Sequence, residues 1–269
     1  MTHYGGLVSE NVADPRLGAA IRVPRLGWIV RGYYAYYYQP PPLNSLSGPL
    51  LDFALAQGVS FTCLHGERDI QHDFGVTLPY RGWALDIDNF HTSARNFLDH
   101  DVIGNSGIFV PLSDLGARIT GTEFSLRSPE IHHAARLRIA YSNQIARGIG
   151  PITGGLLSDS TAETFLLDHD QRNTLSTVLS LRLPWQIWAT PTYSFGSGFL
   201  DGDGPGHLPP HSTVDLAIGK RFGENWSASV NANNLANSRY LLDNSNTFGG
   251  THFIHPRQIY GELRFRFHL

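Results

Sequence analysis

The sequence predicts an all-β protein built from antiparallel strands. Apolar and polar residues alternate with a period of two over segments of about ten residues, the length a tilted strand needs to cross a bilayer. Helical periodicity is nearly absent, and short turns alternate strictly with long polar loops along the chain. These three observations favour a sheet whose consecutive strands are joined as hairpins.

Eleven alternating segments account for most of the chain, and each has one apolar and one polar face. The alternation fails in the segment 119–126, where Ile119 and Phe124 have opposite parities, so we expect a bulge or a shifted register there. In chain order, the expected strands are 17–23, 28–38, 69–78, 83–88, 119–126, 136–145, 174–183, 185–193, 214–222, 226–233 and 259–269.

The last of these segments alternates without interruption to the final residue. Leu263 and Phe265 lie on one face, and Arg264 and Arg266 on the other. In a soluble sheet the apolar face would meet a core, whereas in a membrane barrel it faces lipid and the charged face lines a wet lumen. The strand alone leaves both interpretations open.

The connections between strands separate these two interpretations. Bacterial outer-membrane barrels have tight periplasmic turns and long extracellular loops. This chain has short turns at 24–27, 79–82, 128–130, 183–184 and 223–225, and long loops near 39–66, 95–108, 147–170, 199–211 and 239–253. Glycines at 148–155 indicate a mobile loop. The pattern predicts a transmembrane antiparallel barrel wall whose last strand runs toward the periplasm.

Three tryptophans support this orientation. Trp83, Trp185 and Trp226 each follow a short turn directly. Indole rings favour the membrane–water interface, so tryptophans at equivalent heights indicate a periplasmic girdle. The alternative is that each indole caps a hydrophobic core.

Composition excludes several classes of protein. The chain has 269 residues, of which 41% are hydrophobic and 16% charged, with a net charge of −3, so it lacks the basic footprint of a nucleic-acid-binding protein. No stretch reaches the roughly 18 apolar residues of a spanning helix, and the mean hydropathy is −0.18. Cys63 is the single cysteine, which excludes a disulfide framework. We expect no cofactor and no metal.

The segment Ser229-Val-Asn-Ala-Asn-Asn-Leu-Ala-Asn-Ser-Arg-Tyr240, the pair Gly249-Gly250 and the segment His255-Pro-Arg-Gln-Ile-Tyr-Gly261 resemble the closing hairpin of the TonB-dependent outer-membrane receptors. Segments 14–20, 65–68 with Phe74-Gly75, and 121–123 are similar to repeated features of the same barrels. The resemblance implies a Gram-negative outer-membrane receptor that takes up a scarce nutrient, such as a ferric siderophore, cobalamin or an oligosaccharide. It implies transport without enzymatic activity.

The resemblance also implies that the chain is part of something larger. The family barrel has 22 strands and an N-terminal plug domain, so residues 1–269, with about 11 strands, no plug and no signal peptide, correspond to the C-terminal half of the barrel. We therefore expect a fragment, a split gene product or a partial gene model. Open sheet edges are unfavourable in lipid, so the chain should not insert alone as a stable monomer. The implied partners are outer-membrane lipid, the plug with the remaining strands, a TonB-type energy-transducing protein acting through that plug, and a small solute.

The candidate site residues belong to the polar faces and to the long loops. We expect lumen-facing side chains from Asp86, Asp88, Arg136, Arg138, Asn231, Asn233, Arg264 and Arg266. We expect loop contacts to a ligand from Asp168, His169, Asp170 and His252. Neighbours on an extended chain point in opposite directions, so 168–170 should not converge on one metal ion. Histidines at 65, 91, 100, 169, 207, 211, 252 and 255 are either polar loop residues or contacts to a metal-bearing ligand.

Two other classes of function remain as alternatives. An outer-membrane barrel enzyme of the lipase or protease type needs an even number of strands and a nucleophile near the rim. The count is odd, and the sequence has no Gly-x-Ser-x-Gly element. A soluble all-β binding module would need apolar faces that meet each other.

Overall fold

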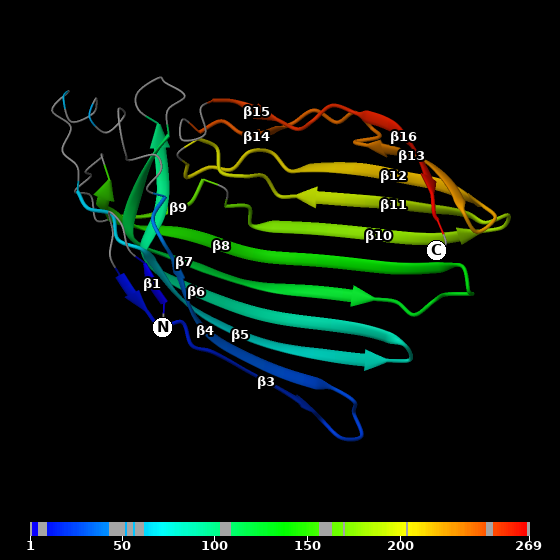
Figure 1. The fold of residues 1–269 in the computed structure, drawn as a ribbon, viewed down its shortest axis with the longest axis horizontal. Coiled ribbons are helices and arrows are strands. Elements are labelled where there is room, and N and C mark those ends of the chain that lie inside the picture. The colour runs from blue at the N-terminus through cyan, green and yellow to red at the C-terminus, as the bar shows by residue number, and fades with distance from the viewer. Residues whose placement is uncertain are drawn as a thin grey trace.

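The chain folds into one long antiparallel sheet with small accessory strands at one end (Figure 1). The computed structural model describes residues 2–4, 10–42, 62–102, 109–155, 163–168, 170–202, 204–245 and 250–267, and the single positions 52 and 56. The long sheet contains β3 (Arg16–Arg22), β4 (Ile29–Gln39), β5 (Glu67–Tyr80), β6 (Trp83–Val102), β7 (Phe109–Arg127), β8 (Ala135–Gly155), β9 (Thr164–Leu166), β10 (Asn173–Leu183), β11 (Ile187–Gly196), β12 (His211–Phe222), β13 (Trp226–Asn233) and β16 (Gln258–Phe265).

Two small ribbons lie beside the long sheet. They are β1 (Thr2–Tyr4) with β2 (Glu10–Val12), and β14 (Leu241–Asp243) with β15 (His252–Phe253). Within the described ranges, the chain contains no helix with the length and apolarity needed to cross a membrane.

The order of the long sheet follows the chain. It is β16-β13-β12-β11-β10-β8-β7-β6-β5-β4-β3, with β9 paired to β8 off this path. Each pair along the path is antiparallel. The path contains the eleven strands predicted from the alternation, which confirms the predicted all-β antiparallel architecture.

The register sorts side chains onto two faces. Cross-strand partners share a face, so Val76 lies beside Ile87, and Asp86 lies beside Thr77 and Ser125. One face is apolar and exposed, with Leu263 69% and Phe74 61% accessible. We name it the apolar face, and the opposite one, which carries Asp86 and its neighbours, the polar face. Large exposed apolar side chains over a sheet this long are those of a membrane wall rather than of a soluble module.

The two ends of the sheet differ as the loop pattern predicts. The five tight hairpin turns lie together at the right of Figure 1, with the C-terminus, and we name this the turn end. Trp83 and Trp226 begin their strands there, and Trp185 lies in the turn between β10 and β11. The strand ends that the long connections join lie at the opposite end of the sheet, which we name the loop end.

Strands β6, β7 and β8 are longer than the sequence pattern predicts. The predicted loops 95–108 and 147–170 are strand over 95–102 and 147–155. The glycines expected to form a mobile loop lie instead within β8. A Cβ atom added at Gly148 would lie 2.3 Å from the Phe165 ring of β9, so this glycine allows close packing.

The bulge expected in 119–126 is also displaced. Residues 117–127 of β7 pair regularly with both neighbours, and the register shifts occur between Ser113 and Gly116. Ile119 breaks the alternation because it lies on the polar face of a regular strand. An apolar residue on the polar face therefore produced the wrong prediction.

Candidate functional site

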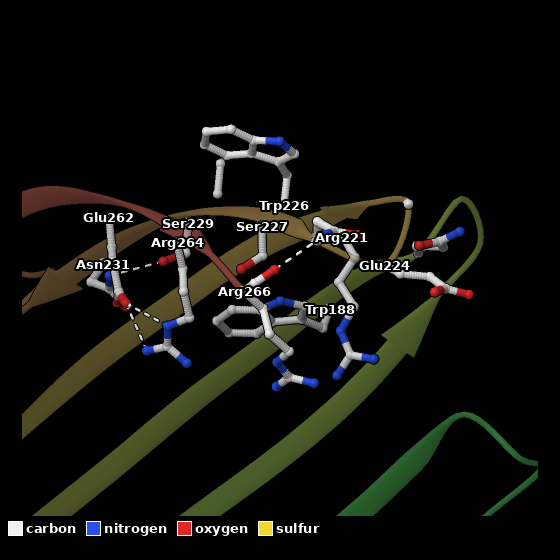
Figure 2. Close-up of a pocket in the computed structure, with 14 residues that line it drawn as sticks. Trp188, Arg221, Glu224, Trp226, Ser227, Ser229, Asn231, Glu262, Arg264 and Arg266 are labelled. Atoms are coloured by element: carbon white, nitrogen blue, oxygen red, sulfur yellow. Dashed lines mark hydrogen bonds and ion pairs between the residues drawn. The ribbon is translucent and has the colours of Figure 1, made fainter. Parts of the chain in front are cut away.

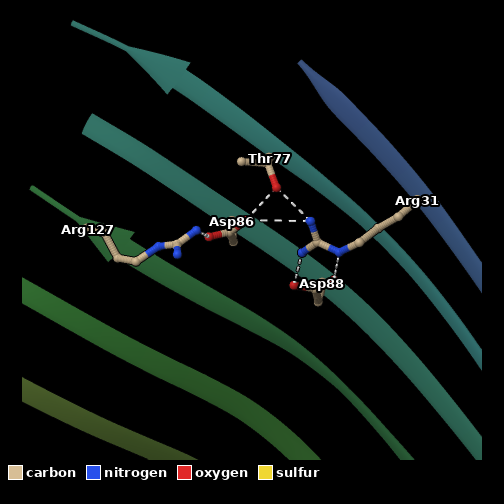
Figure 3. A network of polar contacts seen from close by, with 5 residues as sticks. All are labelled: Arg31, Thr77, Asp86, Asp88 and Arg127. Carbon is tan, nitrogen blue, oxygen red and sulfur yellow. Dashed lines mark hydrogen bonds and ion pairs between the residues drawn. The ribbon is translucent and has the colours of Figure 1, made fainter. Parts of the chain in front are cut away.

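An ion-pair network crosses the polar face near the turn end, over β4, β5, β6 and β7 (Figure 3). Arg31 donates from Nε to Asp88 Oδ1 at 3.0 Å, and a second guanidinium nitrogen pairs with Asp88 Oδ2. Arg127 donates to Asp86 Oδ2 at 2.7 Å, and Thr77 bridges Arg31 and Asp86. Both predicted aspartates are thus held by arginines from other strands, so the network joins four strands.

A glycine makes room for this network. A Cβ atom at Gly75 would lie 2.1 Å from Asp88 Oδ1 and 2.7 Å from Arg31 Nε. Gly75 is the direct cross-strand partner of Asp88, so any side chain there would displace the ion pair.

The predicted arginines of β8 lie in a second polar cluster at the turn end. Glu130, in the turn before β8, accepts hydrogen bonds from Arg136 at 2.9 Å and from Arg182 of β10 at 2.8 Å. Arg138 lines the same shallow hollow of about 300 Å³. This cluster ties a turn to two strands.

A larger hollow lies on the polar face beside β16, and we name it the turn-side hollow (Figure 2). Its volume is about 660 Å³, and the predicted residues Asn231, Arg264 and Arg266 line it. Arg264 donates to Glu262 Oε1 at 2.7 Å. Figure 2 shows these side chains on one side of the strands and Trp226 on the other. Predicted residue Asn233 pairs with Gln258 farther along β13 and does not line the hollow.

A second hollow, at the loop end of the polar face, is built around an aromatic stack. His211, the first residue of β12, stacks on Tyr240 with ring centroids 4.1 Å apart and planes 14° apart. Phe199 also stacks on His211, with ring centroids 5.9 Å apart. With Gln171 and Ser142, His211 and Tyr240 line a cavity of about 460 Å³, which we name the loop-side hollow.

Polar atoms in the loop-side hollow lack partners. The buried atoms Gln171 Oε1 and Ser142 Oγ have no hydrogen-bond partner in the described part of the chain. Burial, with a smaller effect of Asp215, raises the pKa of Tyr240 although a hydrogen bond with Thr213 opposes this, so its hydroxyl keeps its proton. The hollow therefore offers flat rings, a hydroxyl and buried polar atoms free to bond a guest molecule.

Asp170 positions the neighbouring Gln171. Its carboxylate is fully buried, accepts the Ala146 N–H at 2.7 Å and lies 3.1 Å from His207 Nε2. These contacts fix the segment before β10 against β8. Gly196 then allows Gln171 and His211 to approach, because an added Cβ would lie 2.3 Å and 2.5 Å from their polar atoms.

The other predicted loop residues have different surroundings. Asp168 is half-buried, His169 lies outside the described residues, and His252 is 3.6 Å from Asp243 Oδ2. Over the described ranges, no three His, Cys, Asp or Glu side chains form a group that could hold a metal ion.

Sequence reasoning did not single out Gln171, Tyr240 or Phe199, and it named His211 only among the loop histidines. These residues come from connections far apart in the chain. Only the strand register brings them together, since Gly196 pairs with both Thr174 and His211.

Comparisons with known proteins agree with this architecture. A family profile described as "TonB dependent receptor-like, beta-barrel" matches residues 4–235. No curated protein sequence matches the chain.

Solved structures of similar fold include the ferric-catecholate import receptor Fiu of Escherichia coli K12 in its closed form. It has 15% identity and a TM-score of 0.67, and the match covers 96% of this chain and 35% of that one. A mutant of the ferric enterobactin receptor PfeA from Pseudomonas aeruginosa has 16% identity and a TM-score of 0.67, with 94% and 40% covered. The copper transporter OprC has 11% identity and a TM-score of 0.66, with 94% and 39% covered. The chain thus spans between 35% and 40% of the length of these structures.

Proposed function

The chain belongs to the TonB-dependent receptor β-barrel family, and from this premise we propose that it forms a wall segment of a receptor that takes up a scarce solute. The family consists of outer-membrane proteins of Gram-negative bacteria, which are transporters and not enzymes. The whole receptor would combine this wall with a plug domain and further strands. A TonB-type protein acting on that plug would supply the energy.

The loop-side hollow is the observation that carries the proposed solute contact. A buried polar atom without a partner destabilises a fold by about 1–3 kcal/mol. Gln171 Oε1 and Ser142 Oγ are such atoms, and they lie in the same cavity as the ring of Tyr240. A solute with a flat ring and polar edge atoms would satisfy both features. Among the expected cargoes, a ferric siderophore with aromatic iron ligands fits best.

The enzyme and the soluble binding module are less well supported. A match to a transporter family over 4–235 favours transport over a barrel lipase or protease. The exposed apolar face favours a membrane protein over a soluble module.

The test is a binding titration. The full chain, refolded in dodecyl maltoside micelles, is titrated with a ferric tris-catecholate complex while tryptophan fluorescence is recorded. We expect saturable quenching, and Tyr240→Ala should weaken the apparent affinity about ten-fold, the loss of about 1.4 kcal/mol. Tyr80→Ala is the matched control, because Tyr80 lies at the turn end and is 68% exposed.

Two results would contradict the proposed contact. One is an absence of saturable quenching by the complex in wild-type chain. The other is an equal loss in Tyr240→Ala and Tyr80→Ala.

A further inference from the structure

Arginines on the apolar face of the described strands are confined to one belt. Cross-strand register places Arg68 of β5 opposite Arg95 of β6, and Arg118 of β7 opposite Arg147 of β8. We name these four residues the arginine belt, and all four side chains are exposed. The remaining strand arginines lie on the polar face. Lys220, near the turn end, is the one lysine on the apolar face of the described strands.

The belt consists of two directly opposed like-charge pairs. Like charges facing each other across strands are destabilising, so such pairs require a compensating anion. Glu10 of β2 supplies one for Arg68, at 3.2 Å. Burial alone would raise the pKa of Glu10, but hydrogen bonds from Arg68, the Gly66 N–H and His65 lower it.

The other three arginines have no such anion. Within the described residues, no carboxylate forms an ion pair with Arg95, Arg118 or Arg147. Two carboxylates lie nearer the loop end of these strands. Asp99 of β6 is 3.6 Å from His100 Nδ1, and Asp114 of β7 is buried, with 3% of its surface exposed. The positive charge of the belt therefore faces outward.

The belt lies at the height of the membrane surface. Leu85 is the first aliphatic residue on the apolar face of β6, next to Trp83 at the turn end, and Arg95 follows ten residues later. At about 3.3 Å per residue and a tilt of about 40°, that separation is about 25 Å of height, the thickness of the apolar band of an outer-membrane barrel. Arginines at this height contact headgroups rather than acyl chains.

We propose that the arginine belt binds the phosphorylated headgroups of outer-leaflet lipid. Three features carry the assignment: the outward orientation, the three arginines that have no carboxylate partner among the described residues, and the continuity of the belt with the lipid-facing apolar face. Guanidinium groups bind phosphate oxygens through paired hydrogen bonds. The three arginines without a carboxylate partner lie on the adjacent strands β6, β7 and β8, and they match a headgroup with more than one phosphate. The proposal concerns lipid and is independent of the solute.

The test compares two triple variants of the full chain in dodecyl maltoside. The belt variant carries Arg95→Gln, Arg118→Gln and Arg147→Gln. The control variant carries Arg22→Gln, Arg182→Gln and Arg221→Gln, which remove the same charge from exposed arginines of the polar face. Binding of bisphosphorylated lipid A, monophosphorylated lipid A and inorganic phosphate is measured by native mass spectrometry and by competition.

We expect bisphosphorylated lipid A to bind the wild-type chain and the control variant equally, and the belt variant more than ten-fold more weakly. Monophosphorylated lipid A should bind the wild-type chain more weakly than the bisphosphorylated form. Equal binding to both triple variants would overturn the proposal, as would full displacement of the lipid by an equal concentration of inorganic phosphate. If the belt variant loses its β-sheet circular dichroism, the same binding measurement is made on the single variants Arg118→Gln and Arg147→Gln. Weaker binding of bisphosphorylated lipid A than in the control variant supports the proposal, and equal binding overturns it.

Discussion

The two ends of the polar face differ in whether their polar groups have hydrogen-bond partners. At the turn end, Arg31, Asp88, Asp86 and Arg127 all have partners within hydrogen-bond distance. At the loop end, Gln171 Oε1 is buried without one. A network in which every group is hydrogen-bonded stabilises the sheet without a ligand. A buried polar group without a partner lowers the stability of the fold, and a bound molecule that supplies a hydrogen bond removes this penalty. The contrast separates the part of the polar face that holds the sheet together from the part that is open to a guest molecule.

The strongest test of this contrast enlarges a glycine beneath the turn-end network. Gly75→Val should lower the free energy of unfolding by about 2–3 kcal/mol, because its side chain overlaps Asp88 Oδ1 and Arg31 Nε. Gly32→Val on β4 is the matched control, since no atom lies within 4 Å of a Cβ there. Denaturant titration of both variants in detergent micelles measures the difference. Equal losses would remove the special role of Gly75.

Removal of one network carboxylate should have a smaller effect. Asp88→Ala leaves Arg31 without its main partner, and because both side chains are about one-third exposed we expect a loss of about 1–2 kcal/mol. The control is Glu262→Ala, whose pair with Arg264 is 46% and 69% exposed and should contribute less than about 0.5 kcal/mol. The same denaturant titration applies. A larger loss in the control would mean that the strand-joining network contributes no more than an exposed pair.

At the loop end, replacement of a buried polar group should leave the free energy of unfolding unchanged or raise it. Gln171→Leu removes a buried oxygen that has no partner, so stability should stay unchanged or rise by up to about 1 kcal/mol. Binding of the ferric tris-catecholate complex should weaken in the same variant. A clear loss of stability would show that Gln171 is already satisfied within the fold, and the contrast between the two ends would fail.

The alternation of residues predicted the eleven long strands and their faces, because a wall with lipid on one side leaves a period-two signal in each strand. The same signal failed at 95–102 and 147–155. At Gly148 of β8 the residue type follows close packing against Phe165 rather than a lipid-facing pattern. The alternation also failed at Ile119, an apolar residue on the polar face.

Prediction of the site was less complete than prediction of the strands. Asp86 and Asp88 were identified from polarity, but their partners Arg31 and Arg127 lie 57 and 41 residues away. The loop-side hollow depends on contacts among connections that carry no periodic pattern. Its aromatic stack joins His211 to Tyr240 only because register and loop path place them together.

The direction of the two border strands limits what can complete the wall. Since every neighbour on the eleven-strand path is antiparallel, β3 and β16 both run toward the turn end. A second copy in the same membrane orientation would therefore meet either border with a strand of the same direction. A tube sealed by antiparallel hydrogen bonds needs an odd number of additional strands between β16 and β3, and both outer strands of that insert must run toward the loop end. The directions of the two border strands therefore exclude antiparallel closure by a second copy of this chain and allow closure by a segment with an odd number of strands.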